Sequence, residues 1–231
     1  MDTTTNLRLN KHLAHKLGVS RREADEIIEQ GRVTINGRVA TLGARFSETD
    51  TVVFDETLMP TTTPRSTYIL LNKPIGYVCS RRRQGDAPTI YELLPEQYHS
   101  LKSVGRLDKD SSGVLLLTDD GDFAHRMTHP SFHKTKEYEV ALDHDLEPLH
   151  QQMISDYGIE LEDGRSQLTL ARIHDDGRKE WTISMHEGRN RQIRRTFAAL
   201  GYTVTKLHRT RFGNYAIHDI KNGEFKLTDI H

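Results

Sequence analysis

The spacing of apolar residues along residues 67–231 places the strongest limit on how this chain can fold. Residues 68–71 and 114–117 are short, continuous apolar runs of the kind that form buried strands. Residues 138–142 and 181–185 alternate apolar with polar side chains, as half-buried strands do. Because few helical patterns separate these strands, we expect an α+β fold in which helices flank a mixed, mainly antiparallel sheet.

One helix is predicted near the end of this region. Ile193, Phe197 and Leu200 recur at helical spacing, and Gly201 follows as a stop. The opposite face of this helix carries arginines. We therefore expect the helix to pack on the sheet and to present basic groups on its other side.

The first 55 residues predict a separate, compact module. Leucines recur every four residues up to Gly18, and a Ser-x-x-Glu capping box opens a second helix. The dipeptide Asn36-Gly37 then joins two short apolar runs, which predicts a hairpin with a type I′ turn. Residues 56–66 are rich in Thr and Pro and show no periodicity. We therefore expect a small domain at residues 1–55, a linker at 56–66 and a larger domain at 67–231.

Composition excludes several classes of protein. The chain has 231 residues, of which 35% are hydrophobic, and no apolar stretch approaches the roughly 18–20 residues of a membrane helix. Its first residues lack the basic and apolar regions of a secretory signal. Cys79 is the only cysteine, so an internal disulfide and a multi-cysteine zinc site are excluded. We therefore expect a monomeric, cytoplasmic protein that does not bind membranes.

Charge is balanced overall but unevenly distributed. The formal net charge is −1, yet residues 8–45 carry eight Lys and Arg against four acids. Residues 187–211 carry seven Lys and Arg and one acid, whereas residues 143–163 carry seven acids and no Lys or Arg. Segregated basic blocks favour a surface that binds nucleic-acid phosphates, although a solvated face is the commoner explanation of a charge run.

Residues 105–113, Gly-Arg-Leu-Asp-Lys-Asp-Ser-Ser-Gly, are the most unusual stretch and directly precede an apolar strand. Their acidic spacing matches the start of an EF-hand loop, but a calcium site of that kind needs helices on both sides. A plain polar turn is a second interpretation. The third is a catalytic loop that presents Asp108 beside the basic residues Arg106 and Lys109.

Three histidines, His125, His129 and His133, share a four-residue spacing that could align them on a helix as metal ligands. Pro130 interrupts that helix, and no glutamate accompanies the histidines in a zincin arrangement. We therefore expect surface or helix-end histidines and no metal site.

Residues 187–195, Glu-Gly-Arg-Asn-Arg-Gln-Ile-Arg-Arg, concentrate four arginines beside a single acid. A solvated face is the simplest explanation for a run of this kind. Arg194, however, adjoins the apolar Ile193 on the side that turns toward the core, where a buried arginine needs a carboxylate. Because no other acid is nearby in the sequence, we expect that carboxylate to come from elsewhere in the fold.

Together these segments resemble the RsuA/RluB/RluF family of ribosomal RNA pseudouridine synthases, and the first 55 residues resemble an S4 RNA-binding domain. The likeness extends in the family's order over nearly the whole chain. It is carried by residues 71–78, 105–108 with 112–118, 136–138 and 187–195.

The resemblance implies an enzyme that isomerises uridine to pseudouridine in ribosomal RNA without a cofactor or a metal. By position, Asp108 matches the catalytic aspartate, and Tyr138 matches the tyrosine that stacks on the target base. Arg194 matches the arginine that pairs with the catalytic carboxylate, and Ile193 the apolar residue beside it. Lys73 belongs to the motif that braces the catalytic loop.

The chemistry suits these residue types. Breaking the N1–C1′ bond of uridine develops charge at C1′, which a carboxylate can stabilise or trap. An arginine beside an aspartate favours the ionised form of the aspartate. A tyrosine gives a base that has left its stack a new surface, worth on the order of 1–3 kcal/mol.

Other basic residues are expected to hold RNA phosphates, which provides affinity without reading sequence. They are Lys11, Arg21, Arg22, Arg32 and Arg38 in the first module, and Arg81, Arg82, Arg83, Arg189 and Arg191 in the second. Arg106 is assigned to the support of the catalytic loop. Two other functions stay open: a non-catalytic S4-type RNA-binding or ribosome-assembly protein, and a hydrolase of nucleosides or nucleotides that uses the same carboxylate.

Overall fold

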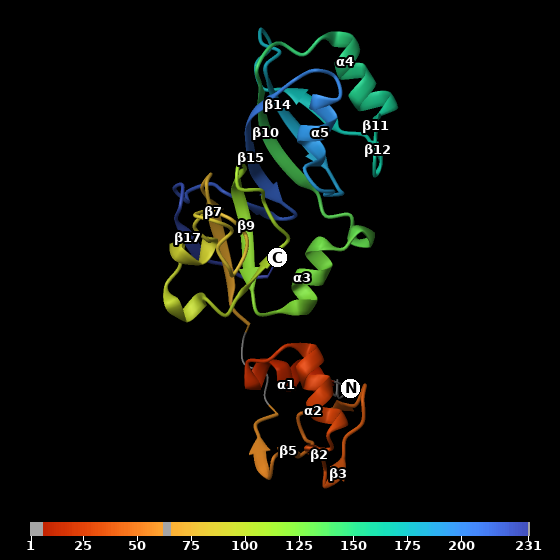
Figure 1. Ribbon diagram of the computed structural model, residues 1–231, viewed down its shortest axis with the longest axis vertical. Coiled ribbons are helices and arrows are strands. Elements are labelled where there is room, and N and C mark those ends of the chain that lie inside the picture. Colours follow the sequence, from red (N-terminus) through yellow and green to blue (C-terminus); the bar gives the residue numbers. More distant parts are fainter. Residues whose placement is uncertain (1–6, 62–65, 231) are drawn as a thin grey trace. The chain divides into compact units, whose positions relative to one another are not determined.

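The computed structural model describes residues 7–61 and 66–230, and the chain divides into two compact units, residues 1–65 and 66–231 (Figure 1). Each unit has buried hydrophobic clusters of its own, as separate domains do. Within the described residues, no helix is long and apolar enough to cross a membrane.

Two short helices open the N-terminal unit. α1 (Leu9–Leu17) ends at Gly18, whose φ of 70° is a left-handed conformation that glycine adopts easily. α2 (Arg21–Glu29) begins with the predicted capping box. The Glu23 amide donates to Ser20 Oγ, and the Ser20 amide donates to the Glu23 carboxylate. Both helix signals in the sequence are therefore confirmed.

The strands of this unit form a small antiparallel sheet and one separate pair. The sheet order is β3 (Arg38–Val39), β2 (Val33–Ile35), β5 (Val52–Phe54) and β6 (Thr57–Met59), while β1 (Leu7–Arg8) pairs with β4 (Arg45–Phe46). Asn36 and Gly37, between β2 and β3, both have positive φ. The predicted type I′ turn requires this conformation at both positions.

The predicted linker begins too early. Thr57–Met59 pairs antiparallel with β5, and Met59 is buried in the core of the N-terminal unit. Met59 is the buried side chain of this short edge strand, so the Thr- and Pro-rich composition concealed the strand. Thr61 also belongs to the unit, because its hydroxyl donates to the Glu48 carbonyl at 2.9 Å. Residues 62–65 of the predicted linker lie outside the described residues.

A mixed sheet runs through the second unit in the order β13, β14, β10, β15, β9, β7, β17, with β8 paired to β9 and β16 paired to β15. These strands are β7 (Tyr68–Lys73), β8 (Lys102–Val104), β9 (Ser112–Thr118), β10 (Lys136–Leu142), β13 (Thr169–Arg172), β14 (Glu180–Met185), β15 (Val204–Phe212), β16 (Tyr215–Ala216) and β17 (Phe225–Leu227). β9 and β15 are parallel, and the other strand pairs of the described sheet are antiparallel. The predicted α+β class with a mainly antiparallel sheet is confirmed.

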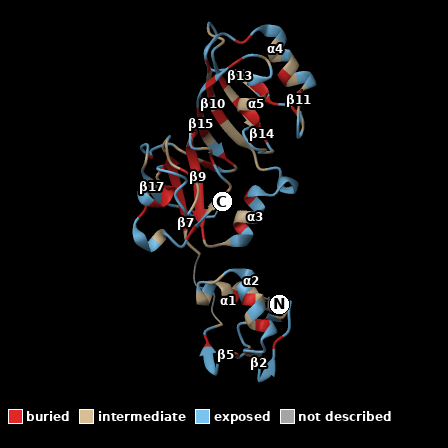
Figure 2. Cartoon of the chain, viewed as in Figure 1, coloured by how far each residue is buried: buried red, intermediate tan, exposed pale blue. Residues whose placement is uncertain are grey.

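Burial distinguishes the two halves of this sheet (Figure 2). β7 is buried at every position and β9 at every position but its first, whereas β10 alternates between buried and half-buried residues from Tyr138 onward. The continuous apolar runs of the sequence therefore correspond to strands covered on both faces. The alternating segments correspond to strands covered mainly on one face.

Helices pack on both halves (Figure 1). α5 (Gln192–Ala198) places Ile193 and Phe197 in the same buried cluster as Tyr138 and Trp181, as its spacing predicted. A hairpin of β11 (Ile159–Leu161) and β12 (Gly164–Ser166) contacts α5. The remaining helical segments are η1 (Ile90–Leu93), η2 (Glu96–Tyr98), α3 (Gly121–Thr128), η3 (Pro130–Phe132), α4 (Pro148–Gln152) and the π-helical turn η4 (Met153–Tyr157).

The two halves of the sheet meet where β9 and β15 run parallel, with Ser112 opposite His208 and Gly113 opposite Arg209. A Cβ atom on Gly113 would lie 2.1 Å from the Arg209 carbonyl oxygen, and the φ of Gly113 is 109°. Both facts require glycine at this position. The loop that precedes β9 is therefore anchored at the junction of the two halves.

Candidate active site

Lys73 fixes the backbone of the loop at residues 105–111. Its side chain is fully buried, and Nζ donates to the carbonyl oxygens of Pro74, Asp108 and Ser111 at 3.0, 3.1 and 2.7 Å. Burial lowers the pKa of Lys73. An ammonium group with three carbonyl acceptors braces the loop from within the fold, which is the position that the family resemblance implied.

Further hydrogen bonds complete the loop's attachment. The Gly76 amide donates to the Lys109 carbonyl at 2.7 Å, and the Leu107 amide donates to Cys79 Sγ at 3.4 Å. The backbone is therefore held on several sides, while the Asp108 side chain keeps 34% of its surface exposed.

A cleft of about 490 Å³ opens beside this loop, between the two halves of the sheet. It brings together residues from β10, β15, the loop before β9 and the segment that leads into α5. Of the residues predicted to act in catalysis, its walls include Arg106, Asp108, Tyr138 and Ile193. Lys73 and Arg194 contact the loop from outside the cleft.

The ion pair at the Asp108 carboxylate is formed by Arg191, whereas Arg194, the predicted partner, interacts with Asp108 through its charge. Arg191 Nη1 lies 3.6 Å from Asp108 Oδ2, and its guanidinium donates to both carboxylate oxygens of Asp110 at 3.0 and 2.8 Å. Arg194 lies one helical turn later, where it donates to the Val204 and Asp110 carbonyls, each at 2.8 Å. Its Nε is 3.3 Å from Asp110 Oδ2. The buried arginine does have a carboxylate partner from elsewhere in the fold, and that partner is Asp110.

Asp110 couples the two arginines electrostatically. The hydrogen bonds from Arg191, together with the charges of Arg194 and Arg191, lower the pKa of Asp110 below its ordinary value of 3.8 against the effect of burial. The same contact raises the pKa of Arg191, whereas burial lowers the pKa of Arg194. Sequence reasoning had considered Asp110 only as a calcium ligand, because its arginine partners lie about eighty positions away.

Tyr138 is both a core residue and a wall of the cleft. It is 8% exposed and belongs to the main hydrophobic cluster, with Arg209 of β15 and Ile183 of β14 as its register neighbours. Arg209 also lines the cleft and was missed by sequence reasoning. It is 2% exposed, donates to the Val114 carbonyl at 2.8 and 2.6 Å, and lies 4.8 Å from the centre of the Phe212 ring. β15 also carries Lys206, His208 and Arg211, so the sequence did not single out Arg209 among these basic residues.

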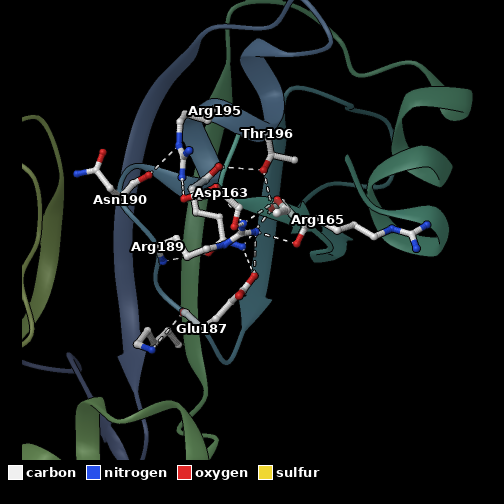
Figure 3. Close-up of polar contacts among 11 residues, drawn as sticks. Asp163, Arg165, Glu187, Arg189, Asn190, Arg195 and Thr196 are labelled. Carbon is white, nitrogen blue, oxygen red and sulfur yellow. Dashed lines mark hydrogen bonds and ion pairs between the residues drawn. The ribbon is translucent and has the colours of Figure 1, made fainter. Parts of the chain in front are cut away.

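Arg189, predicted to bind RNA, is instead held by protein groups (Figure 3). Its guanidinium donates to three consecutive carbonyl oxygens at residues 163–165 and to the Asp163 carboxylate, and its side chain is 20% exposed. These contacts give Arg189 a role within the protein, and its contact with RNA stays a prediction.

The other basic residues predicted to bind RNA differ in how far the protein engages them. Those that are exposed include Arg21, Arg22, Arg38 and Arg82, while Lys11 is half-buried. Protein partners include Asp55 and the Phe54 ring for Arg32, Glu92 for Arg83, and the carbonyls of Ser100 and Leu101 for Arg81.

Among the described residues, no cluster of three or more His, Cys, Asp or Glu side chains is arranged to hold a metal ion. α3 contains His125 but ends at Thr128, and Pro130 opens the separate turn η3. His133 then has a φ of 45°. The evenly spaced histidines therefore do not share one helix, which agrees with the helix break expected at Pro130.

Two family patterns match the chain. Residues 67–199 match RNA pseudouridylate synthase, and residues 7–52 match the S4 domain. The chain belongs to the RNA pseudouridylate synthase family. The synthase match runs from β7 into the end of α5, so it contains the loop with Asp108, Tyr138 and the arginine-rich segment.

Full-length relatives agree with this assignment. The chain is 39% identical to a Pasteurella multocida protein named ribosomal small subunit pseudouridine synthase A, over 95% of both chains. It is 33% identical to a Bacillus subtilis protein named ribosomal large subunit pseudouridine synthase B, over 97% of this chain and 93% of that one. The crystal structure of a pseudouridylate synthase matches with a TM-score of 0.67 and 34% identity over 96% of both chains. The predicted family, S4 domain and fold of this synthase are confirmed.

Proposed function

We propose that this chain converts specific uridines to pseudouridine in ribosomal RNA, with the Asp108 carboxylate as its reactive group. The observation that carries the proposal is the setting of Asp108. It is a partly exposed carboxylate on a braced loop, in the wall of a cleft that Tyr138, Ile193 and several arginines also line. The names of the relatives support ribosomal RNA as the substrate class.

The reaction exchanges one bond for another within a single nucleotide. The N1–C1′ bond of uridine breaks, the base turns, and C5 bonds to C1′. C5 then loses its proton and N1 gains one, so no electrons enter or leave and no cofactor is needed. Charge develops at C1′ as the first bond breaks, and Asp108 stabilises or captures it. Arg191, 3.6 Å away, restrains the direction of the carboxylate.

The target uridine must leave its stack in structured RNA before Asp108 can reach the ribose. Tyr138 gives the extruded base an aromatic surface, and Ile193 gives it an apolar one. Exposed arginines of the S4 domain add affinity for the RNA backbone. We place this activity in the cytoplasm, with the chain acting as a monomer on naked RNA or on assembling subunits.

Mapping pseudouridine at single-nucleotide resolution tests the proposal. The protein is incubated with deproteinised small- and large-subunit RNA and with partly assembled subunits, and new pseudouridine is expected at one or a few positions. Asp108→Asn keeps the size of the side chain, so it should abolish product and leave RNA affinity within a few-fold. RNA binding with no product from the unaltered protein would support the non-catalytic function, and release of free uracil would support the hydrolase.

A uridine that carries deuterium at C2′ separates two possible roles of Asp108. If the carboxylate removes the C2′ proton and forms a glycal, product formation should slow through a primary kinetic isotope effect. If the carboxylate attacks C1′ directly, the C2′–H bond stays intact and no such effect is expected.

A further inference from the structure

A hairpin outside the predicted catalytic segments is attached to the loop that carries Arg191 (Figure 3). Asp163 lies in the turn between β11 and β12. Its Oδ1 accepts from Arg189 Nη1 at 3.0 Å, and its Oδ2 accepts from Arg195 Nη2 at 2.6 Å. One carboxylate therefore bridges two arginines that lie on either side of Arg191 in the sequence.

Arg189 extends this attachment into the backbone of the hairpin. Nη1 donates to the carbonyls of Asp163 and Gly164 at 2.9 and 2.7 Å, and Nη2 donates to the carbonyl of Arg165 at 2.8 Å. Gly164 has a φ of 106°, a conformation that favours glycine and turns the backbone at this point. A guanidinium with this many fixed acceptors locates the loop relative to the hairpin.

Neutral hydrogen bonds continue the attachment into α5. Gln192 Nε2 donates to Ser166 Oγ at 3.1 Å, and Gln192 Oε1 accepts from the Arg189 amide at 3.2 Å. Ser166 Oγ and Thr196 Oγ1 lie 2.7 Å apart. Gln192, Ser166 and Thr196 are all buried. Because buried polar groups are costly to leave unpaired, the hairpin and the first turn of α5 are held together.

Arg191 lies between these anchors in an unfavourable backbone conformation. Its φ is 45°, which a non-glycine residue keeps only where its surroundings impose it. Arg195, held by Asp163, donates through Nε to the Asn190 carbonyl at 2.8 Å and so fixes the peptide group that precedes Arg191. From this constrained backbone the Arg191 guanidinium reaches Asp110 and Asp108.

We propose that Asp163 is a positioning residue of the active site, which holds the segment at residues 187–191 so that Arg191 meets the carboxylates of Asp108 and Asp110. The effect of Asp163 on the catalytic rate rests on the proposed function. Asp163 is the last acid of the acidic run at residues 143–163, so one member of that run acts on the site from outside it.

Kinetics of Asp163→Ala test this role, with Glu160→Ala as the matched control. Glu160 is an exposed acid on β11 of the same hairpin. Because displacement of a catalytic neighbour by about 1 Å can slow a reaction by about a hundredfold, we expect kcat of Asp163→Ala to fall by about tenfold to a hundredfold. KM should stay within a few-fold, and Glu160→Ala should match the unaltered protein. Asp163→Asn keeps the backbone carbonyl and one side-chain acceptor, so its kcat should lie between those of Asp163→Ala and Glu160→Ala.

A second measurement needs no RNA and no activity. Carbon-13 NMR of the aspartate carboxyl groups follows the pKa of Asp110, which the Arg191 hydrogen bonds lower. We expect this pKa to rise toward 3.8 in Asp163→Ala and to stay unchanged in Glu160→Ala. If the unaltered protein forms no pseudouridine, the proposed function fails, while the Asp110 titration still decides the positioning role.

An unchanged Asp110 pKa in Asp163→Ala would overturn the inference. So would a raised KM with unchanged kcat, because that pattern describes an RNA contact. Should Asp163→Ala fail to fold, the same two measurements on Asp163→Asn decide the question, with normal kcat and normal Asp110 titration counting against the role.

Discussion

Cationic side chains serve different purposes in the two units of this protein. In the synthase domain, Lys73 and Arg209 are buried, Arg194 is mostly buried, and all three donate to main-chain carbonyls near the cleft. In the S4 domain, Arg22 and Arg38 are exposed on a helix and an edge strand. The same charge therefore fixes geometry at these positions of the synthase domain and faces solvent at Arg22 and Arg38.

This difference separates two kinds of experimental effect. Removing a buried cation leaves carbonyl groups unpaired and lets the loop move, so the catalytic rate should respond first. Removing an exposed cation takes away a phosphate partner, so affinity and its dependence on salt should respond first. Net charge alone would not have distinguished the two sets.

The largest effect is expected from Lys73→Met. The substitution removes three hydrogen bonds, two of them to the loop that carries Asp108, so kcat should fall by about a hundredfold or more. The free energy of unfolding should drop by about 2–3 kcal/mol, since three carbonyls lose their donor while the cost of burying a charge disappears. Single-turnover kinetics and urea denaturation measure both. Lys102→Met, at an exposed lysine of β8, is the control and should change neither. Activity near the normal level in Lys73→Met would refute the bracing role.

Arg191→Ala tests a residue that could either position the active site or bind an RNA phosphate. Sequence reasoning predicted an RNA contact, whereas the structure pairs Arg191 with Asp110 and Asp108. We expect kcat to fall by about tenfold to a hundredfold with RNA affinity within a few-fold. Arg82→Ala, at an exposed arginine, should give the reverse pattern of weaker binding and normal kcat. If the two variants behaved alike, pairing with a carboxylate would not separate positioning from binding.

Local signals explain how much of the fold could be predicted. The capping box at Ser20, the turn at Asn36-Gly37 and the helix around Ile193 depend on residues within a few positions of each other, and all three are confirmed. The strand Thr57–Met59 could not be predicted, because its single buried side chain creates no periodicity. Helices, strands and turns with a strong local pattern can thus be predicted from the sequence alone.

The sequence indicated which residues lie in the site better than it indicated which carboxylate pairs with which arginine. The resemblance placed Asp108, Tyr138 and Ile193, and the structure gathers all three in one cleft. Which carboxylate meets which arginine depends on how the loop before β9 faces the start of α5, and no local pattern encodes that orientation. Asp110 therefore appeared only as a possible calcium ligand.

A smaller effect is expected from the exposed arginines of the S4 domain. In the double variant Arg22→Ala, Arg38→Ala, RNA affinity should fall by several-fold while kcat stays normal. If each arginine neutralises one phosphate, the slope of log affinity against log salt should become shallower by about 1–2. Filter binding at several salt concentrations measures this slope. An unchanged slope would show that these arginines do not contact the RNA backbone. The exposed arginines of the S4 domain would then have no binding role to set against the positioning role of the buried cations.

The smallest expected effect concerns one histidine in each unit, half-buried His208 in the synthase domain and buried His12 in the S4 domain. Burial lowers the pKa of His208, at the β9–β15 junction, and of His12, in the S4 core, below the ordinary 6.5. Above that value both are neutral in the folded and the unfolded chain. As pH falls through it, the unfolded chain takes up protons first, so stability should decline until the folded pKa is reached.

Chemical denaturation near pH 7.5 and near pH 5.5 should show each unit losing on the order of 1 kcal/mol or less. His208→Gln should reduce the loss in the synthase domain, and His12→Gln the loss in the S4 domain. His208 has a hydrogen-bond partner in Ser112 at 2.9 Å, whereas His12 Nε2 is buried with no partner in the described part of the chain. A pH dependence that appears in both units would mean that burial, and not the unit to which a side chain belongs, sets how its charge behaves. If only the synthase domain lost stability, the two units would differ in the local surroundings of their histidines as well as in the exposure of their charged residues.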